Sequence, residues 1–191
     1  MAENVQEAFA AAMTPQAFIE QMTKNQDVFA AWGNRFAWQN ADDEAFFQGL
    51  RGKTDVRCLI IAADWCGDVV RNVPVVLKVM GAAAIETRML IMEQHLDVMD
   101  RFLTMGGRSI PVVLFIDPQG DVLAKWGPRP EYIQQPMVKF KQENPDRSAP
   151  TYEENLKAAR AEIMKRYGED TGYQGLIVKE LRELLAGAAS H

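Results

Sequence analysis

The stretch that decides the fold is Arg57-Cys58-Leu59-Ile60-Ile61-Ala62-Ala63-Asp64-Trp65-Cys66-Gly67-Asp68-Val69. After Arg57 it begins with a continuous apolar run, which is typical of a central strand covered on both faces. From Val69 to Met80 the apolar residues recur at helical spacing, and Gly81 is the expected end of that helix. The strand therefore leads directly into a helix, and Cys66 stands where the helix begins.

Further elements follow along the chain. Alternation over residues 86–92 predicts a second strand, so residues 57–92 form a βαβ unit with a right-handed crossover. A helix is expected over about residues 94–105, ending at Gly106-Gly107.

A hairpin is predicted next. Strands are expected over Val112–Ile116 and Val122–Trp126, and Asp117-Pro118-Gln119-Gly120 between them has the residue types of a type I turn. The middle of the chain therefore reads β-α-β-α-β-β-α, which is an α/β arrangement with helices available to both faces of the sheet.

Both ends of the chain look helical. Thr14-Pro15 is a typical N-cap and first-turn pair, and Asp42 is the expected start of another helix. Thr151-Tyr152-Glu153-Glu154 has the form of a capping box. It predicts a helix that ends at Gly168 and places these residues on one face: Leu156, Ala159, Ile163 and Met164. A last helix is expected over about residues 174–186.

Length and composition predict one ordinary globular domain. The chain has 191 residues, of which 48% are hydrophobic and 25% charged, and its net charge is −5. Because acids and bases are mixed along it, we expect no binding to nucleic acid. The expected organisation is a single domain, 1–191, made of an N-terminal helical extension (1–54), a core (55–142), a polar surface connection (143–150) and C-terminal helices (150–187).

The sequence also indicates in which cellular compartment the protein is expected. The acidic start of the chain does not resemble a signal peptide, and the longest apolar runs are far shorter than the roughly 18 residues of a membrane span. Two cysteines, Cys58 and Cys66, cannot form the disulfide framework of a small secreted protein. We therefore expect a cytoplasmic protein without a membrane partner.

Cys66 is the leading candidate for chemistry. The unpaired N–H groups at a helix start favour a thiolate, and the pKa of thiols so placed can fall from about 8.5 to between roughly 3.5 and 7.5. A thiolate attacks disulfides or peroxides, which would leave a mixed disulfide or a sulfenic acid at Cys66.

Several motifs carry a family resemblance. Trp65-Cys66-Gly67 after a strand resembles the thioredoxin active site, Pro74 resembles its helix-kinking proline, and Ser109-Ile110-Pro111 resembles its cis-proline loop. Longer strings are similar to a bacterial branch of thioredoxin-like proteins: Arg71-Asn72-Val73-Pro74, Gly106-Gly107-Arg108-Ser109-Ile110-Pro111 and Trp126-Gly127-Pro128-Arg129-Pro130.

This resemblance covers about residues 55–130 and implies a thioredoxin-like fold with added N-terminal and C-terminal helices. It also implies site residues. Cys66 and Pro111 would be catalytic, with Arg108 tuning the thiol. The substrate would lie against Trp65, Gly67, Asp68 and Ile110.

The sequence departs from the thioredoxin pattern at two positions. Val69 stands where a dithiol thioredoxin has its second cysteine, so a mixed disulfide would wait for an external thiol. Ile60 stands where many thioredoxins bury an acid. Cys58 lies roughly 13 Å before the end of its strand, whereas a disulfide needs Cα atoms closer than about 7 Å, so we interpret Cys58 as structural.

Charges near Cys66 leave two interpretations open. Asp64 and Asp68 would raise the pKa of the thiol, and Arg108 would offset them. Alternatively, Asp68 caps the helix and pairs with Arg71, while Arg108 is solvated or bridges Asp64.

The leading hypothesis is single-cysteine thiol redox chemistry at Cys66, with a protein or a small-molecule thiol or disulfide as partner. The alternative is a thioredoxin-fold module that binds peptides or proteins without catalysis. No cofactor or metal is expected, because His95 and His191 lack partners at ligand spacing. Cluster binding as in monothiol glutaredoxins is disfavoured, since Cys66 is followed by Gly-Asp-Val and not by Gly-Phe-Ser.

Overall fold

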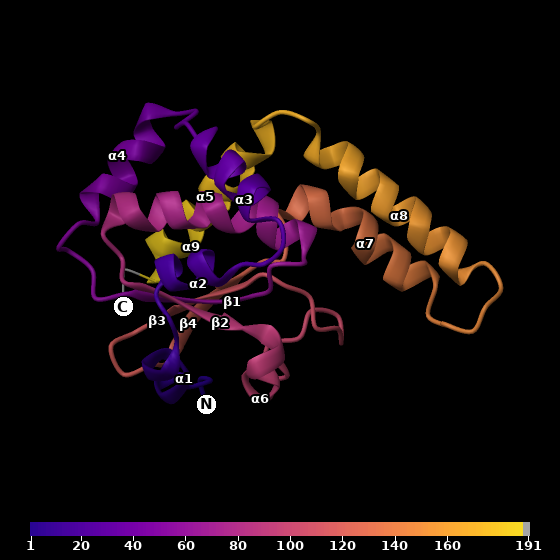
Figure 1. The fold of residues 1–191 in the computed structure, drawn as a ribbon, viewed down its shortest axis with the longest axis horizontal. Coiled ribbons are helices and arrows are strands. Elements are labelled where there is room, and N and C mark those ends of the chain that lie inside the picture. Colours follow the sequence, from indigo (N-terminus) through magenta and orange to yellow (C-terminus); the bar gives the residue numbers. More distant parts are fainter. Residues whose placement is uncertain (189–191) are drawn as a thin grey trace.

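The computed structural model describes residues 1–188, in which four strands form one sheet between layers of helices (Figure 1). The strands are β1 (Arg57–Ala62), β2 (Thr87–Ile91), β3 (Val112–Ile116) and β4 (Val122–Trp126), in the order β2-β1-β3-β4. β1 is parallel to β2 and antiparallel to β3, and β3 is antiparallel to β4. The predicted βαβ unit and the predicted hairpin are both confirmed.

β1 lies in the middle of the sheet, which explains its composition. It pairs with β2 on one side and β3 on the other, and every residue after Arg57 is buried. A strand with neighbours on both sides and helices over both faces has no solvated face, so alternation of polar residues disappears. Helix α5 (Gly67–Ala83) follows directly and contains Pro74.

One face of the sheet is covered by α5 and α9 (Gly172–Ala188). Two N-terminal helices, α3 (Gln26–Asn34) and α4 (Ala41–Gly49), pack on α5 from outside (Figure 1). α9 contacts β4, where the indole Nε1 of Trp126 donates a hydrogen bond to Glu180 over 2.9 Å. Helix α9 therefore belongs to the core.

The opposite side carries α1 (Gln6–Ala11), the 3-10 turn η1 (Met92–Gln94) and α6 (Leu96–Met99), as Figure 1 shows. α2 (Pro15–Gln21) packs beside the edge strand β2. The segment that contains α1 is tied to both edges of the sheet. The N–H of Val5 donates to the carbonyl of Gly120 over 2.8 Å, and Met13 pairs with Met89 of β2. Between these ties, α1 buries Phe9 in the core.

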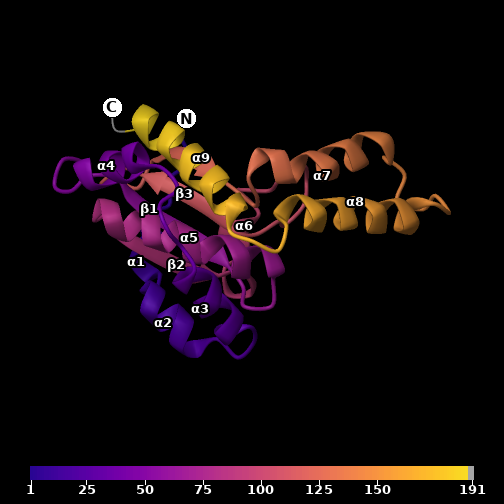
Figure 2. The same cartoon turned by 90° about the horizontal axis from the view of Figure 1, so that it is seen from above.

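An arm projects from this body. α7 (Glu131–Glu143) and α8 (Tyr152–Tyr167) pack along each other as a helical hairpin, away from the sheet (Figures 1 and 2). Its outer end has a small apolar cluster of its own, where Phe140 and Tyr152 meet edge to face at 5.1 Å. The sequence predicts a helix directly after the last strand as part of the core. In the structure the helix that follows β4 is α7, which packs in the arm, and the helix that packs on the sheet is α9.

The helix expected over residues 94–105 is present only in part, as the short helix α6. The backbone of His95 is not helical, with φ −139° and ψ 48°, and α6 ends at Met99. The chain then turns, because Lys125 of β4 donates hydrogen bonds from Nζ to the carbonyls of Phe102 and Leu103. These carbonyls are held toward β4 and do not continue a helix.

Helix starts show how local signals compete. Thr14 caps α2 as predicted, since its Oγ1 accepts from the N–H of Ala17. The helix predicted to start at Asp42 is present as α4, but its start is earlier. Asn40 is the N-cap residue, and its side chain accepts a hydrogen bond from the N–H of Asp42.

The helix predicted from the capping box at Thr151 is confirmed as α8, whose N-cap residue is Thr151 and whose C-cap residue is Gly168. The capping hydrogen bond itself is not formed, because the backbone of Thr151 is already helical, with φ −91° and ψ −2°. Tyr152, the first residue of α8, packs on Phe140 of α7. Met164, which we expected on the packed face of α8, is 52% exposed.

Candidate functional site

Cys66 is the N-cap residue of α5 and lies beside the loop that precedes β3. The residue is 9% exposed, and its thiol donates a hydrogen bond to the carbonyl oxygen of Ile110 over 3.5 Å. The peptide bond between Ile110 and Pro111 is cis. The two segments meet because β1 and β3 are antiparallel neighbours, which puts the end of β1 next to the start of β3.

Burial decides the protonation state of this thiol. It raises the pKa of Cys66 above the ordinary value of 9.0, and the negative charge of Asp68 raises it further. The backbone N–H groups of Val69 and Asp68 and the charge of Arg129 act in the opposite direction. The helix start does favour the thiolate, as the sequence suggests, but loss of hydration at a buried sulfur outweighs it. The thiol is therefore protonated at neutral pH.

Asp68 belongs to a polar network. Its carboxylate accepts two hydrogen bonds from the guanidinium of Arg129, both over 2.8 Å, and one from the hydroxyl of Tyr167 over 2.7 Å. The side-chain amide of Asn72 donates to that hydroxyl and to the carbonyl of Pro128. The expected pair between Asp68 and Arg71 is not formed, and neither does Asp68 cap α5, so that interpretation is wrong.

Arg71 is held by aromatic rings instead. Its guanidinium carbon lies 4.7 Å from the ring centre of Trp32, 4.9 Å from that of Tyr167 and 5.8 Å from that of Tyr173. Its Nη1 donates to the carbonyl of Gly168 over 3.1 Å. These contacts stabilise the cation by cation–π attraction without a carboxylate.

Arg108 lies away from the thiol. Its guanidinium makes two hydrogen bonds to Asp100, over 2.7 and 2.9 Å, and about half of each side chain is exposed. The cation that lowers the pKa of Cys66 is Arg129. Asp64 does not pair with Arg108 either, because it accepts from the backbone of Thr23, which lowers the pKa of Asp64.

Of the predicted site residues, the fold gathers Cys66, Asp68, Ile110 and Pro111. Trp65 is half exposed beside them, with its indole Nε1 donating to Glu93 over 2.5 Å.

Sequence reasoning missed three polar residues at this site, which are Arg129, Tyr167 and Asn72. Arg129 stands 61 positions from Asp68 and Tyr167 stands 99 positions from it. No local spacing joins residues so far apart, and the only sign in the sequence is that Arg129 and Asn72 lie in strings that carry the family resemblance.

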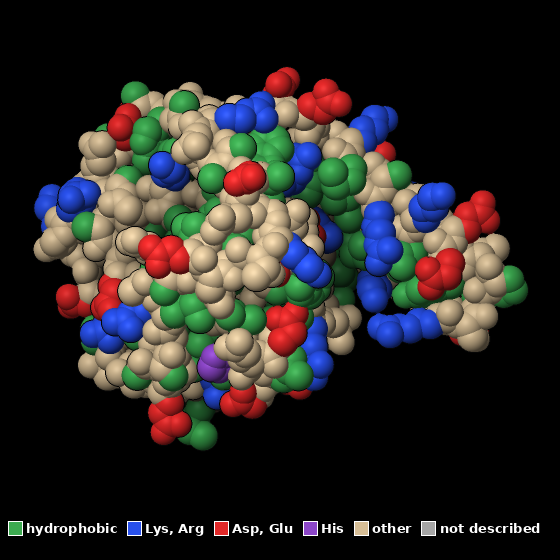
Figure 3. Space-filling view, in the orientation of Figure 1, with side chains coloured by type: hydrophobic (Ala, Val, Ile, Leu, Met, Phe, Trp, Pro, Cys, Tyr) green, Lys and Arg blue, Asp and Glu red, His purple; other side chains and the backbone are tan. Residues whose placement is uncertain are grey.

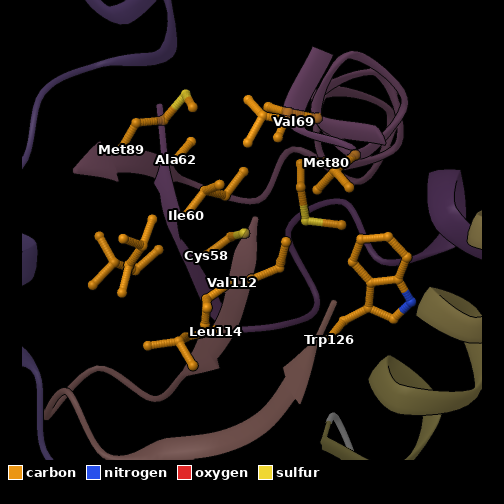
Figure 4. Close-up of a cluster of buried hydrophobic side chains, with 14 of the residues drawn as sticks. Cys58, Ile60, Ala62, Val69, Met80, Met89, Val112, Leu114 and Trp126 are labelled. Carbon is orange, nitrogen blue, oxygen red and sulfur yellow. The ribbon is translucent and has the colours of Figure 1, made fainter. Parts of the chain in front are cut away.

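Cys58 is fully buried on β1, among the apolar side chains of the core (Figure 4). Both cysteines are free thiols. Burial raises the pKa of the Cys58 thiol from 9.0 to about 12. A sulfur so enclosed cannot reach an external disulfide, which fits the structural role expected for it.

We expect Cys58 to make the protein sensitive to alkali. Its pKa is raised on folding, so the stabilisation is complete below pH 9 and is lost as the pH rises from 9 toward 12. Between pH 8 and pH 10, the free energy of unfolding of the wild type should fall about 1 kcal/mol more than that of Cys58→Ala. Urea unfolding of both proteins under reducing conditions measures this difference. Equal losses would contradict the predicted effect.

Other kinds of site are not evident in the described part of the chain. Within residues 1–188, no three His, Cys, Asp or Glu side chains gather in a way that could hold a metal ion. Among the same residues, none of the helices has the length and apolar character needed to cross a membrane.

Comparisons with known proteins agree with this fold. A family model described as thioredoxin matches residues 12–149. The structure is similar to that of a protein of unknown function from Pseudomonas aeruginosa, with a TM-score of 0.69, 17% identity, and coverage of 97% of this chain and 99% of that one. A crystallised HIV epitope scaffold is similar too, with a TM-score of 0.68, 15% identity and coverage of 97% and 99%. No curated protein sequence matches the chain.

The two structural similarities show the fold alone, whereas the family model covers more than half of the sequence, including the strand β1, the thiol of Cys66 and the loop at Pro111. The chain therefore belongs to this thioredoxin family.

Proposed function

We propose that the protein performs thiol–disulfide exchange through the single thiol of Cys66, with a protein or a small-molecule thiol or disulfide as its partner. The observation that carries this proposal is the position of the Cys66 sulfur, at the start of α5 and 3.5 Å from the carbonyl of Ile110 beside Pro111. Cys58 supplies no second thiol, because it is enclosed in the core.

In the proposed reaction, Cys66 loses its proton to water and its sulfur attacks a disulfide. A new bond forms between Cys66 and one sulfur of the substrate, the original S–S bond breaks, and the leaving thiolate takes up a proton. Val69 cannot resolve the mixed disulfide. An external thiol must attack it, which restores Cys66 and carries the first partner away as a new disulfide.

The test is the formation of a mixed disulfide with 2-hydroxyethyl disulfide, followed by mass spectrometry. Wild type and Cys58→Ala should form one adduct each, and Cys66→Ser should form none. Because burial raises the pKa of Cys66, the rate should increase about tenfold between pH 7 and pH 8. An adduct on Cys66→Ser, or none on the wild type, would be evidence against the proposal. A rate that levels off below pH 8 would contradict the raised pKa of Cys66 and leave the exchange reaction standing.

A second candidate function is a binding module without turnover. It is favoured by the burial of Cys66, a residue that is 9% exposed and whose thiol is hydrogen-bonded to Ile110. Such a module would hold an extended peptide by its backbone and would not need the sulfur. Partners captured by Cys66→Ser as well as by wild type support binding, whereas partners captured only by wild type, and released by a reductant, support exchange.

The cellular location is part of the same proposal. Exchange through one cysteine needs an external thiol in excess, which a reducing cytoplasm provides. Both cysteines are free thiols, in keeping with this location.

A further inference from the structure

A cavity of about 340 Å³ lies between the start of α5 and the arm helix α8. Gly67, the residue after Cys66, forms part of one wall. The opposite wall is a single face of α8, with residues at the i, i+3, i+4 and i+7 positions: Arg160, Ile163, Met164 and Tyr167. Its volume falls within the range of small-molecule sites, roughly 300 to 1,000 Å³.

The cavity has an excess of positive charge. Arg71, Arg129 and Arg160 line it together with Asp68, so its formal charge is +2 in a protein whose net charge is −5. The charge of Arg129 is balanced by Asp68, at 2.8 Å. Within residues 1–188, Arg71 forms no salt bridge, and Arg160 has neither a hydrogen bond nor an ion pair. Two guanidinium groups without a carboxylate partner therefore line one cavity.

Apolar surface lies beside these cations. Met164 is 52% exposed although it stands on the face of α8 that lines the cavity, and Ile163 is buried next to it. Figure 3 shows Lys and Arg side chains around the hollow where the arm meets the body. A ligand with a short apolar chain and a carboxylate matches both features, because a guanidinium pairs with a carboxylate through two parallel hydrogen bonds.

We propose that this cavity binds the carboxylate of a small acidic disulfide and brings its sulfur atoms to Cys66. The second half of the inference rests on the proposed exchange reaction, and the first half does not. In the step concerned, the Cys66 thiolate bonds to one sulfur of the disulfide, the S–S bond breaks, and a small thiol that bears a carboxylate leaves with a proton from water.

Binding is tested without chemistry by titrating suberate, a dicarboxylate with the chain length of 3,3′-dithiodipropionate but no sulfur. Calorimetry should show binding to the wild type at one site. Arg160→Gln should weaken it about fivefold, because one charged hydrogen bond is lost at a partly solvated site. Lys157→Gln is the matched control, since Lys157 is exposed on the same helix, changes the net charge equally and does not line the cavity. No binding, or equal binding to Arg160→Gln and the wild type, overturns the proposal.

Reactivity is tested with three disulfides of similar size: acidic 3,3′-dithiodipropionate, neutral 2-hydroxyethyl disulfide and cationic cystamine. At low ionic strength the acidic disulfide should react with Cys66 about tenfold faster than the cationic one, and Arg160→Gln should reduce this ratio. Equal rates for all three overturn the acidic specificity and leave the exchange reaction standing. Suberate binding without reaction of any disulfide overturns the exchange reaction and leaves the carboxylate site standing.

Discussion

Replacing Gly127 by alanine should destabilise the protein more than any other small substitution near the site. Gly127 has φ +106°, a conformation that side chains rarely adopt, and an added Cβ would lie 2.3 Å from the backbone oxygen of Pro111. Backbone strain and overlap together should cost about 4 kcal/mol of unfolding free energy. In a domain of this size the melting temperature should fall by about 10 °C.

The matched control for this prediction is Gly81→Ala. Gly81 is in α5, has no positive φ, and an added Cβ would meet no heavy atom within 4 Å. Alanine there should stabilise the helix by about 0.5 to 1 kcal/mol. Thermal unfolding of both variants measures the two effects, which should have opposite signs. A Gly127→Ala protein as stable as the wild type would show that the loop at Pro111 can move freely, and the packing described for the site would be wrong.

Replacing Arg129 by methionine should have the second largest effect, on both stability and the thiol. The side chains of Arg129 and Asp68 are only 15% and 18% exposed, so the substitution leaves a largely buried carboxylate without its cation. We expect a loss of about 3 kcal/mol. The pKa of Cys66 should rise further, because the charge of Arg129 lowers it and that of Asp68 raises it.

Two further variants make this prediction specific. Adding Asp68→Asn to Arg129→Met removes the unpaired charge and keeps an acceptor for Tyr167, so the double variant should recover part of the lost stability. Arg108→Met breaks the pair with Asp100 at the surface and should cost less than about 1 kcal/mol.

Urea unfolding measures stability in all three variants, and the rate of iodoacetamide alkylation in a Cys58→Ala background measures the thiol. Arg129→Met should slow alkylation, and Arg108→Met should leave it unchanged. If Arg108→Met slowed alkylation instead, Arg108 would be the residue that tunes Cys66, as first expected from the sequence.

The contrast between these two arginines shows the limit of sequence reasoning at the site. Arg108 was assigned to the thiol because its loop leads to Pro111, and that loop does lie beside Cys66. Its guanidinium nevertheless turns to Asp100, only eight positions away. Arg129 has no local signal that points to the thiol, because its partner Asp68 is distant in sequence and becomes a neighbour through folding.

Helices show the same limit at a larger scale. The strands and α5 were predictable, because apolar runs, turn residues and helical spacing are local patterns. The role of α9 was not, since an amphipathic helix can pack on any apolar surface. α7 and α8 bury their apolar faces against each other in the arm. The face of the sheet next to β4 is therefore covered by the last helix, α9.

By itself, the sequence determined the four strands and helix α5, the position of Cys66 at the start of that helix, and the lack of a second cysteine where a dithiol thioredoxin needs one. These properties depend on neighbouring residues, so they can be read from a short stretch. Only the tertiary structure decided that Cys66 is a buried thiol whose pKa is raised, that Arg129 pairs with Asp68 near it, and that α8 and the start of α5 enclose a cationic cavity. Burial and charge at a point in space are sums over residues from the whole chain, and those sums exist only after folding.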